Sequence, residues 1–144
     1  MLQHSLETLG LAFVAQLVVG VLLSGTVYAA LYGKKTKAEY EANPTLRPEG
    51  ARARRDLPLT YLLQNGALGI VFVMIYSAVS NVPVFHGAGG GIFLGFLIWL
   101  GFIAPWHLTM RLYIHYPRTF VNMNLLYSFL YGTIGGGVIG FVLS

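Results

Sequence analysis

Long apolar runs, separated by short polar segments, dominate the chain. Four runs are each long enough to cross roughly 30 Å of hydrocarbon, which takes about 20 residues of α-helix. They cover residues 9–32, 57–80, 91–112 and 120–143, and none has an ionisable residue near its centre or alternates between polar and apolar positions. Because a bilayer offers backbone N–H and C=O groups no partners, we predict four transmembrane helices. The expected fold class is all-α, an integral membrane four-transmembrane-helix bundle that forms a single membrane domain over residues 1–144.

The composition leads to the same class of protein. The 144 residues are 56% hydrophobic and 10% charged, whereas soluble domains carry about 25% charged residues. Too few polar side chains remain to cover a water-soluble globule, so we expect lipid around the protein. The chain has no cysteine, which excludes disulfides, thiolate metal ligands and thiol nucleophiles.

The positions of the charges predict the topology. All nine Lys and Arg residues lie in segment 33–56 or segment 111–119. Four spans place these two segments on one side of the membrane, and the positive-inside rule makes that side the cytoplasm, with both chain ends outside. We expect the bacterial inner membrane or an equivalent organelle membrane. The net charge of +4 therefore indicates topology and not a nucleic acid partner.

The basic segment 33–56, expected to be a cytoplasmic loop, has a second interpretation. Lys and Arg beside a membrane attract anionic lipid headgroups by about 1 kcal/mol each. The candidate headgroup-binding residues are Lys34, Lys35, Lys37, Arg52, Arg54 and Arg55. Setting the topology explains these residues equally well, and we rank that interpretation first.

Three residues predict local helix features. Asp56 is expected to cap the second helix, with Pro58 in its first turn, where a missing N–H costs nothing. Pro105 leaves a carbonyl of the third helix without its usual donor, which predicts a kink.

Glycine recurs at intervals of four residues in two of the predicted helices. The series are Gly87, Gly91 and Gly95 at the third helix, and Gly132, Gly136 and Gly140 in the fourth. Such spacing leaves a smooth groove into which another backbone can pack. Both grooves lie toward the outer side, so we predict that they pack on each other or on a partner subunit. The alternative is that glycine is simply commoner in membrane helices.

A polar stripe on the third helix is the candidate cofactor-binding site. His107, Arg111 and His115 follow at intervals of four residues and share one face. Four amides are expected at the same depth: Gln64, Asn65, Asn122 and Asn124. The functional interpretation is a site for a lipid headgroup, quinone or haem. We favour the alternative, in which Arg111 and His115 reach the interface while His107 bonds a neighbour, and we predict no cofactor and no metal.

The segment from Gly95 to Pro105, the segment from Gly25 to Gly33 and the run from Asn122 to Gly137 carry packing motifs of glycine and aromatic residues. Together they resemble a small family of four-helix bacterial membrane proteins known only as a domain of unknown function. The likeness touches most of the chain, although the first basic segment is longer here. The resemblance implies the same four-span architecture and brings no catalytic residues.

The sequence contains no catalytic motif. It has no Ser-His-Asp set, no phosphate-cradling glycine loop and no HExxH motif, so we expect no enzyme. The leading prediction is a structural or accessory subunit of a larger membrane protein complex. Its partners would be membrane lipids and other membrane subunits or further copies of itself. The alternative is a small lipid- or quinone-binding membrane protein or carrier that uses the layer around His107.

Overall fold

The computed structural model describes residues 5–42, 50–113 and 118–144, and nearly all of them are helical, with no strand in these ranges. The all-α prediction is therefore confirmed. The helices and turns follow in the order α1 (Leu6–Leu23), η1 (Ser24–Tyr28), α2 (Ala29–Ala42), α3 (Gly50–Val79), η3 (Pro83–Phe85), α4 (Gly87–Ile98), η4 (Trp99–Ile103), α5 (Ala104–Tyr113) and α6 (Arg118–Val142).

Three continuous helices are long and apolar enough to cross a membrane: Leu6–Thr26, Gly87–Tyr113 and Arg118–Val142. In α3 the apolar stretch is the shorter Asn65–Val79. By length and composition, the described part of the chain thus provides three full-length candidates where the sequence predicted four.

The first basic segment differs from the prediction. It was expected to be a loop over residues 33–56, but α2 runs to Ala42 and α3 begins at Gly50. Asp56 and Pro58 consequently lie inside α3, so Asp56 does not cap it. The reason is that Ala, Lys, Arg and Glu, which fill these stretches, favour helix whether or not lipid surrounds them. Residues 43–49 lie outside the described part of the chain.

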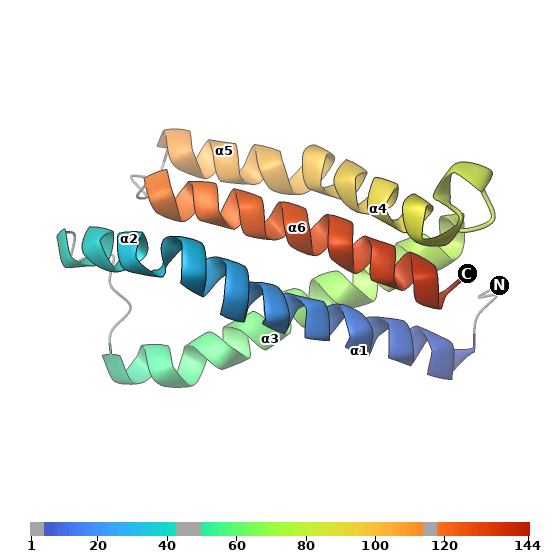
Figure 1. Ribbon diagram of the computed structural model, residues 1–144, viewed down its shortest axis with the longest axis horizontal. Helices are drawn as coiled ribbons and strands as arrows, with labels where there is room; N and C mark the ends of the chain where they lie inside the picture. The colour runs from blue at the N-terminus through green and yellow to red at the C-terminus, as the bar shows by residue number, and fades with distance from the viewer. Residues whose placement is uncertain (1–4, 43–49, 114–117) are drawn as a thin grey trace.

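Helix α6 occupies the centre of the bundle and contacts α1, α3, α4 and α5. In Figure 1 the continuous helices α1–α2 and α4–α5 run along its two sides, and α3 crosses behind them at an angle. Helix α1 begins and α6 ends at the same end of the bundle (Figure 1). The basic part of α2 lies at the opposite end.

The closest helix pair is α4 and α6, whose backbones touch. A Cβ atom added at Gly91 would overlap the carbonyl oxygen of Gly136, and one at Gly95 would overlap that of Gly132. The structure therefore brings the two glycine series together in antiparallel pairs, the third being Gly87 with Gly140. No side chain fits between the two backbones at these positions.

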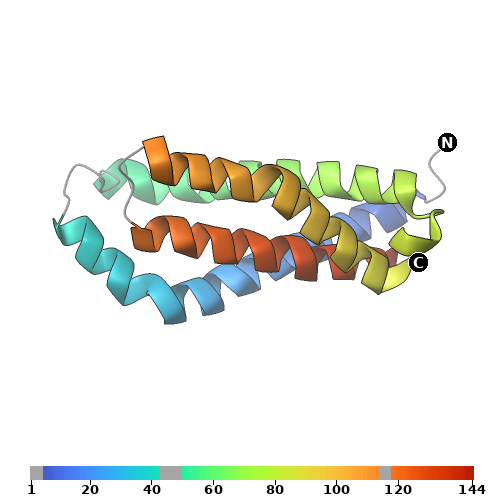
Figure 2. The same ribbon diagram turned by 90° about the horizontal axis from the view of Figure 1, so that it is seen from above.

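Two π-helical turns interrupt the long helices. At η1 the hydroxyl of Ser24 donates to the Val21 carbonyl and that of Thr26 to the Leu22 carbonyl. Such bonds from a side chain to a carbonyl of the preceding turn often bend helices. At η4 the Ala104 N–H donates to the Trp99 carbonyl, five residues back. Figure 2 shows both long helices changing direction near these turns.

The bend in the third predicted helix therefore involves a π turn as well as Pro105. The π turn η4 (Trp99–Ile103) ends two residues before this proline. Because Pro105 has no N–H to donate, the ladder is already broken there, and the wider turn accommodates the break upstream.

Replacing Gly95 with Ala tests the contact between α4 and α6. The added methyl group meets the Gly132 carbonyl, so we expect the free energy of unfolding to fall by about 1–3 kcal/mol, the usual cost of overpacking. The matched control is Gly89→Ala, also in α4, where nothing lies within 4 Å of an added Cβ. Denaturant unfolding of both variants in the same detergent measures the difference, and equal losses would contradict the close contact.

Candidate functional site

The structure does not assemble the predicted stripe of the third helix into a site. His107 of α5 is half-buried and Arg111 is exposed, while His115 lies outside the described residues. Neither described side chain of the stripe forms a hydrogen bond with another residue that the structure describes. The same ranges contain no group of three His, Cys, Asp or Glu residues suited to a metal ion.

Of the amides expected at the same depth, Asn124 bonds within its own helix. The Asn124 Nδ2 atom donates to the Phe120 carbonyl of its own helix, at 2.9 Å. Asn122 is exposed and Asn65 is buried. Within the described part of the chain, no hydrogen bond links Asn65, Asn122 or Asn124 to His107. The side chain of Gln64 lies outside the described part. Contacts therefore give no support to a cofactor site around His107.

Gln16, near the middle of α1, is the most deeply buried amide among the residues whose burial the structure describes, with 1% of its surface exposed. Glycines on two other helices make room for it. A Cβ at Gly69 of α3 would lie 3.1 Å from the Gln16 Oε1 atom, and one at Gly135 of α6 would lie 3.1 Å from its Cγ atom. Gln16 thus occupies the point where α1, α3 and α6 meet.

The Oε1 atom of Gln16 is buried and accepts no hydrogen bond from any described residue. A buried polar atom without a partner costs about 1–3 kcal/mol. A donor that reached this oxygen would recover that free energy. The fold therefore holds an unmet hydrogen-bonding group in its interior.

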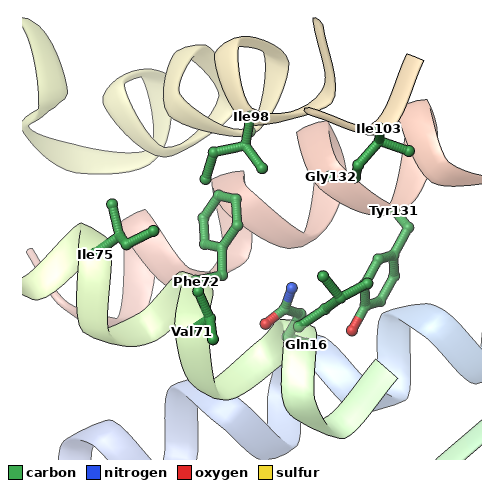
Figure 3. A pocket seen from close by; sticks show the side chains of 10 residues that line it. Gln16, Val71, Phe72, Ile75, Ile98, Ile103, Tyr131 and Gly132 are labelled. Atoms are coloured by element: carbon green, nitrogen blue, oxygen red, sulfur yellow. The ribbon is translucent and has the colours of Figure 1, made fainter. Parts of the chain in front are cut away.

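Gln16 also lines a crevice of about 50 Å³ between α1, α3, α4 and α6. The other lining residues are Leu68, Val71, Phe72, Ile75, Gly95, Ile98, Ile103, Tyr131 and Gly132. Figure 3 shows the Gln16 amide on one side of the crevice and Ile98 on the opposite side, with the Tyr131 ring beside the amide. Among the described lining residues, only the Gln16 amide and the Tyr131 hydroxyl are polar side-chain groups.

Tyrosine hydroxyls tie the helices around the crevice together. Each donates to a backbone carbonyl of another helix, in the pairs Tyr76 to Gly87 (3.1 Å), Tyr127 to Gly20 (3.3 Å) and Tyr131 to Asn65 (3.3 Å). These bonds connect α3 with α4, α6 with α1 and α6 with α3. Interhelical hydrogen bonds in membrane bundles are worth about 0.6 kcal/mol on average and at most about 1.7 kcal/mol. The three hydrogen bonds therefore each add a modest stabilisation to the arrangement of helices around the crevice.

Trp99 fastens the π turn η4 to α6. Its Nε1 atom lies 3.2 Å from both the Leu125 carbonyl and the Ser128 hydroxyl, and donates to them. Its ring meets Phe129 edge-on with centroids 5.1 Å apart. This role of Trp99 was not predicted from the sequence. Because Ile98 and Ile103 border this turn, Trp99 also helps to fix one wall of the crevice.

Sequence analysis missed Gln16, although a signal was present. It is the only Asn or Gln in the predicted span 9–32 and lies well inside it. A polar side chain within a membrane span costs free energy to bury, and for that reason it often marks a functional site. The stripe around His107 gives a stronger sequence signal, because three polar residues recur there at regular spacing.

Comparisons of this chain with protein-family models, curated proteins and solved structures find no match. The resemblance to four-helix bacterial membrane proteins therefore stays a prediction.

Replacing Tyr76 with Phe tests the hydrogen-bonded ties. Tyr76 is fully buried, and its loss of the hydroxyl leaves the Gly87 carbonyl without this donor. We expect the free energy of unfolding to fall by about 1 kcal/mol. The control is Tyr113→Phe, because Tyr113 is 80% exposed at the end of α5. Loss of the Tyr113 hydroxyl should leave the free energy of unfolding unchanged. Unfolding in detergent distinguishes the two, and an unchanged Tyr76→Phe protein would contradict the tie.

Proposed function

We propose that the chain is an integral membrane protein that crosses the bilayer four times, with α3 as its second span. Three helices of spanning length and the apolar Asn65–Val79 stretch support this. Large apolar side chains on the outside of the bundle support it too, since Leu11, Met74 and Phe141 are 61%, 61% and 75% exposed. In water such exposure would forgo about 25 cal/mol for each Å² left unburied.

In this proposal the basic segments lie in the cytoplasm and both chain ends lie outside, in the bacterial inner membrane or its organelle equivalent. Lys34, Lys35 and Lys37 are exposed on α2, where they are free to meet anionic lipid headgroups. The Lys37 ammonium lies 3.9 Å from the Glu41 carboxylate, one turn on. With both side chains mostly exposed, that pair adds about 0.3–0.5 kcal/mol at most.

The function that we infer is that of a non-catalytic accessory subunit of a larger membrane complex. The supporting observation is the outer face of the α4–α5 helix. Phe102 and Trp106 are 77% and 63% exposed there, next to Gly101, where an added Cβ would meet nothing within 4 Å. Large side chains beside a glycine form a ridge next to a groove, and another membrane helix can pack into such a surface. Aromatic residues are also enriched in protein interfaces.

The alternative proposal, a lipid- or quinone-binding protein that uses His107, has less support. His107 and Arg111 have no hydrogen-bonded neighbours in the described chain that would orient a ligand between them.

Cysteine labelling tests the topology. The chain has no native cysteine, so Ser5→Cys, Ser144→Cys and Lys35→Cys each introduce one reactive site. In intact cells we expect a membrane-impermeant maleimide to label the Ser5→Cys and Ser144→Cys proteins. Lys35→Cys should react only after the membrane is permeabilised. Labelling of only one chain end in intact cells would mean an odd number of spans.

Co-purification in mild detergent tests the accessory role. We expect neighbouring membrane subunits to accompany the wild-type protein and their yield to fall about tenfold in the Phe102→Ala, Trp106→Ala double variant, as for residues at the centre of an interface. The control is Phe141→Ala on α6, which is 75% exposed and should keep its partners. A wild-type protein that purifies as a lone monomer would refute the accessory role.

A further inference from the structure

The crevice beside Gln16 has a polar group that packing alone does not explain. Gln16 is 1% exposed, and its Oε1 atom has no hydrogen-bond partner in the described chain. Gly69 and Gly135 leave the space that it fills. An apolar side chain of similar size would occupy that space without the cost of a buried, unpaired amide. The amide therefore adds a hydrogen-bonding group at a position where an apolar side chain would be enough to fill the space.

The lining of the crevice limits the chemistry of a ligand. None of the described residues that line it is charged, so they offer an ion no counter-charge. The Tyr131 hydroxyl already donates to the Asn65 carbonyl at 3.3 Å. A glutamine amide donates to a carbonyl through Nε2 or accepts from a hydroxyl at Oε1. A matching ligand is therefore uncharged and mainly apolar, with one hydroxyl or carbonyl oxygen.

The size and position of the crevice indicate how such a molecule enters. About 50 Å³ accommodates only the narrow end of a lipid-sized molecule. The rest would lie along α3, where Leu68, Val71 and Ile75 line the crevice yet remain 41%, 52% and 38% exposed. A molecule dissolved in the bilayer can approach this side laterally, without passing through water.

We propose that this crevice binds the oxygen-bearing end of a neutral, membrane-soluble molecule, held by the Gln16 amide. Quinones with apolar tails and long-chain alcohols share this chemistry, and the experiment below distinguishes them. The proposal rests on the membrane location proposed above and is independent of any partner subunit.

Photolabelling in lipid nanodiscs tests the proposal. Two diazirine probes are compared: a decanol derivative and the matching alkane, which lacks the hydroxyl. We expect the alcohol to label residues 68–75 and 98–103, as mapped by mass spectrometry, about tenfold more than the alkane, the scale of one hydrogen bond made away from water. In Gln16→Leu the alcohol should fall to the alkane level.

A second pair of variants tests the mouth of the crevice and keeps the proposal testable if Gln16→Leu fails to fold. Val71→Trp narrows the opening, and we expect it to abolish labelling by the alcohol. Ile70→Trp is the matched control, because Ile70 and Val71 are both 52% exposed but only Val71 lines the crevice. Ile70→Trp should label like the wild type.

Competition experiments distinguish a quinone from an alcohol as the ligand that supplies the oxygen atom. Excess decylbenzoquinone should suppress labelling more than excess decanol if the ligand is a quinone, and less if it is an alcohol. Failure of both to compete would overturn the proposal. So would equal labelling of the wild type by the alcohol and alkane probes, or equal labelling of Val71→Trp and Ile70→Trp. Those results would leave Gln16 to be satisfied by water alone.

These outcomes are separable from failure of the proposed function. Release of the protein from native membranes by alkaline extraction would refute the membrane location. A membrane-embedded protein without partners would refute only the accessory role. Equal labelling by the two probes in an embedded protein would refute only the ligand crevice.

Discussion

The contact between the backbones of α4 and α6 is the constraint on which the rest of the arrangement depends. Surrounded by lipid, as we propose, helices gain nothing from excluding water, so they associate through close packing and hydrogen bonds. Glycine at three successive turns of both helices permits that packing here. It sets the depth of α4 against α6, and with it the positions from which Trp99 reaches Leu125 and Tyr76 reaches Gly87.

Helix α6 packs in three directions because its small residues lie on different faces. Gly132, Gly136 and Gly140 meet α4, while Gly135 faces Gln16 of α1. Tyr131, which is 5% exposed, reaches toward α3. With α4 and α1 held close by these contacts, α3 is left to cross the bundle obliquely (Figure 1). The crevice lies between this oblique helix and the helices that it crosses.

Much of the fold was predictable from the sequence, because it depends on local patterns. Apolar runs predicted helices, and glycine spacing predicted which faces could approach closely. Helix ends in charged stretches were not predictable from hydropathy, because the propensity that extends α2 to Ala42 and starts α3 at Gly50 is independent of lipid. The crevice at Gln16 depends on the relative placement of four helices, which no single segment encodes. Spacing placed His107 and Arg111 on one face of a helix, but it does not show which residues of the neighbouring helices lie opposite them.

The π turn η4 also changes the angular phase of the helix that contains it. A π turn inserts one extra residue, and each residue advances an α-helix by about 100° around its axis. Residues from this turn onward, such as Phe102 within it and Trp106 after it, therefore point in directions that the periodicity of α4 would not give them. The same continuous helix can keep its glycines against α6 in one half and turn Phe102 and Trp106 outward in the other. One inserted residue thus makes a single helix serve two differently oriented surfaces.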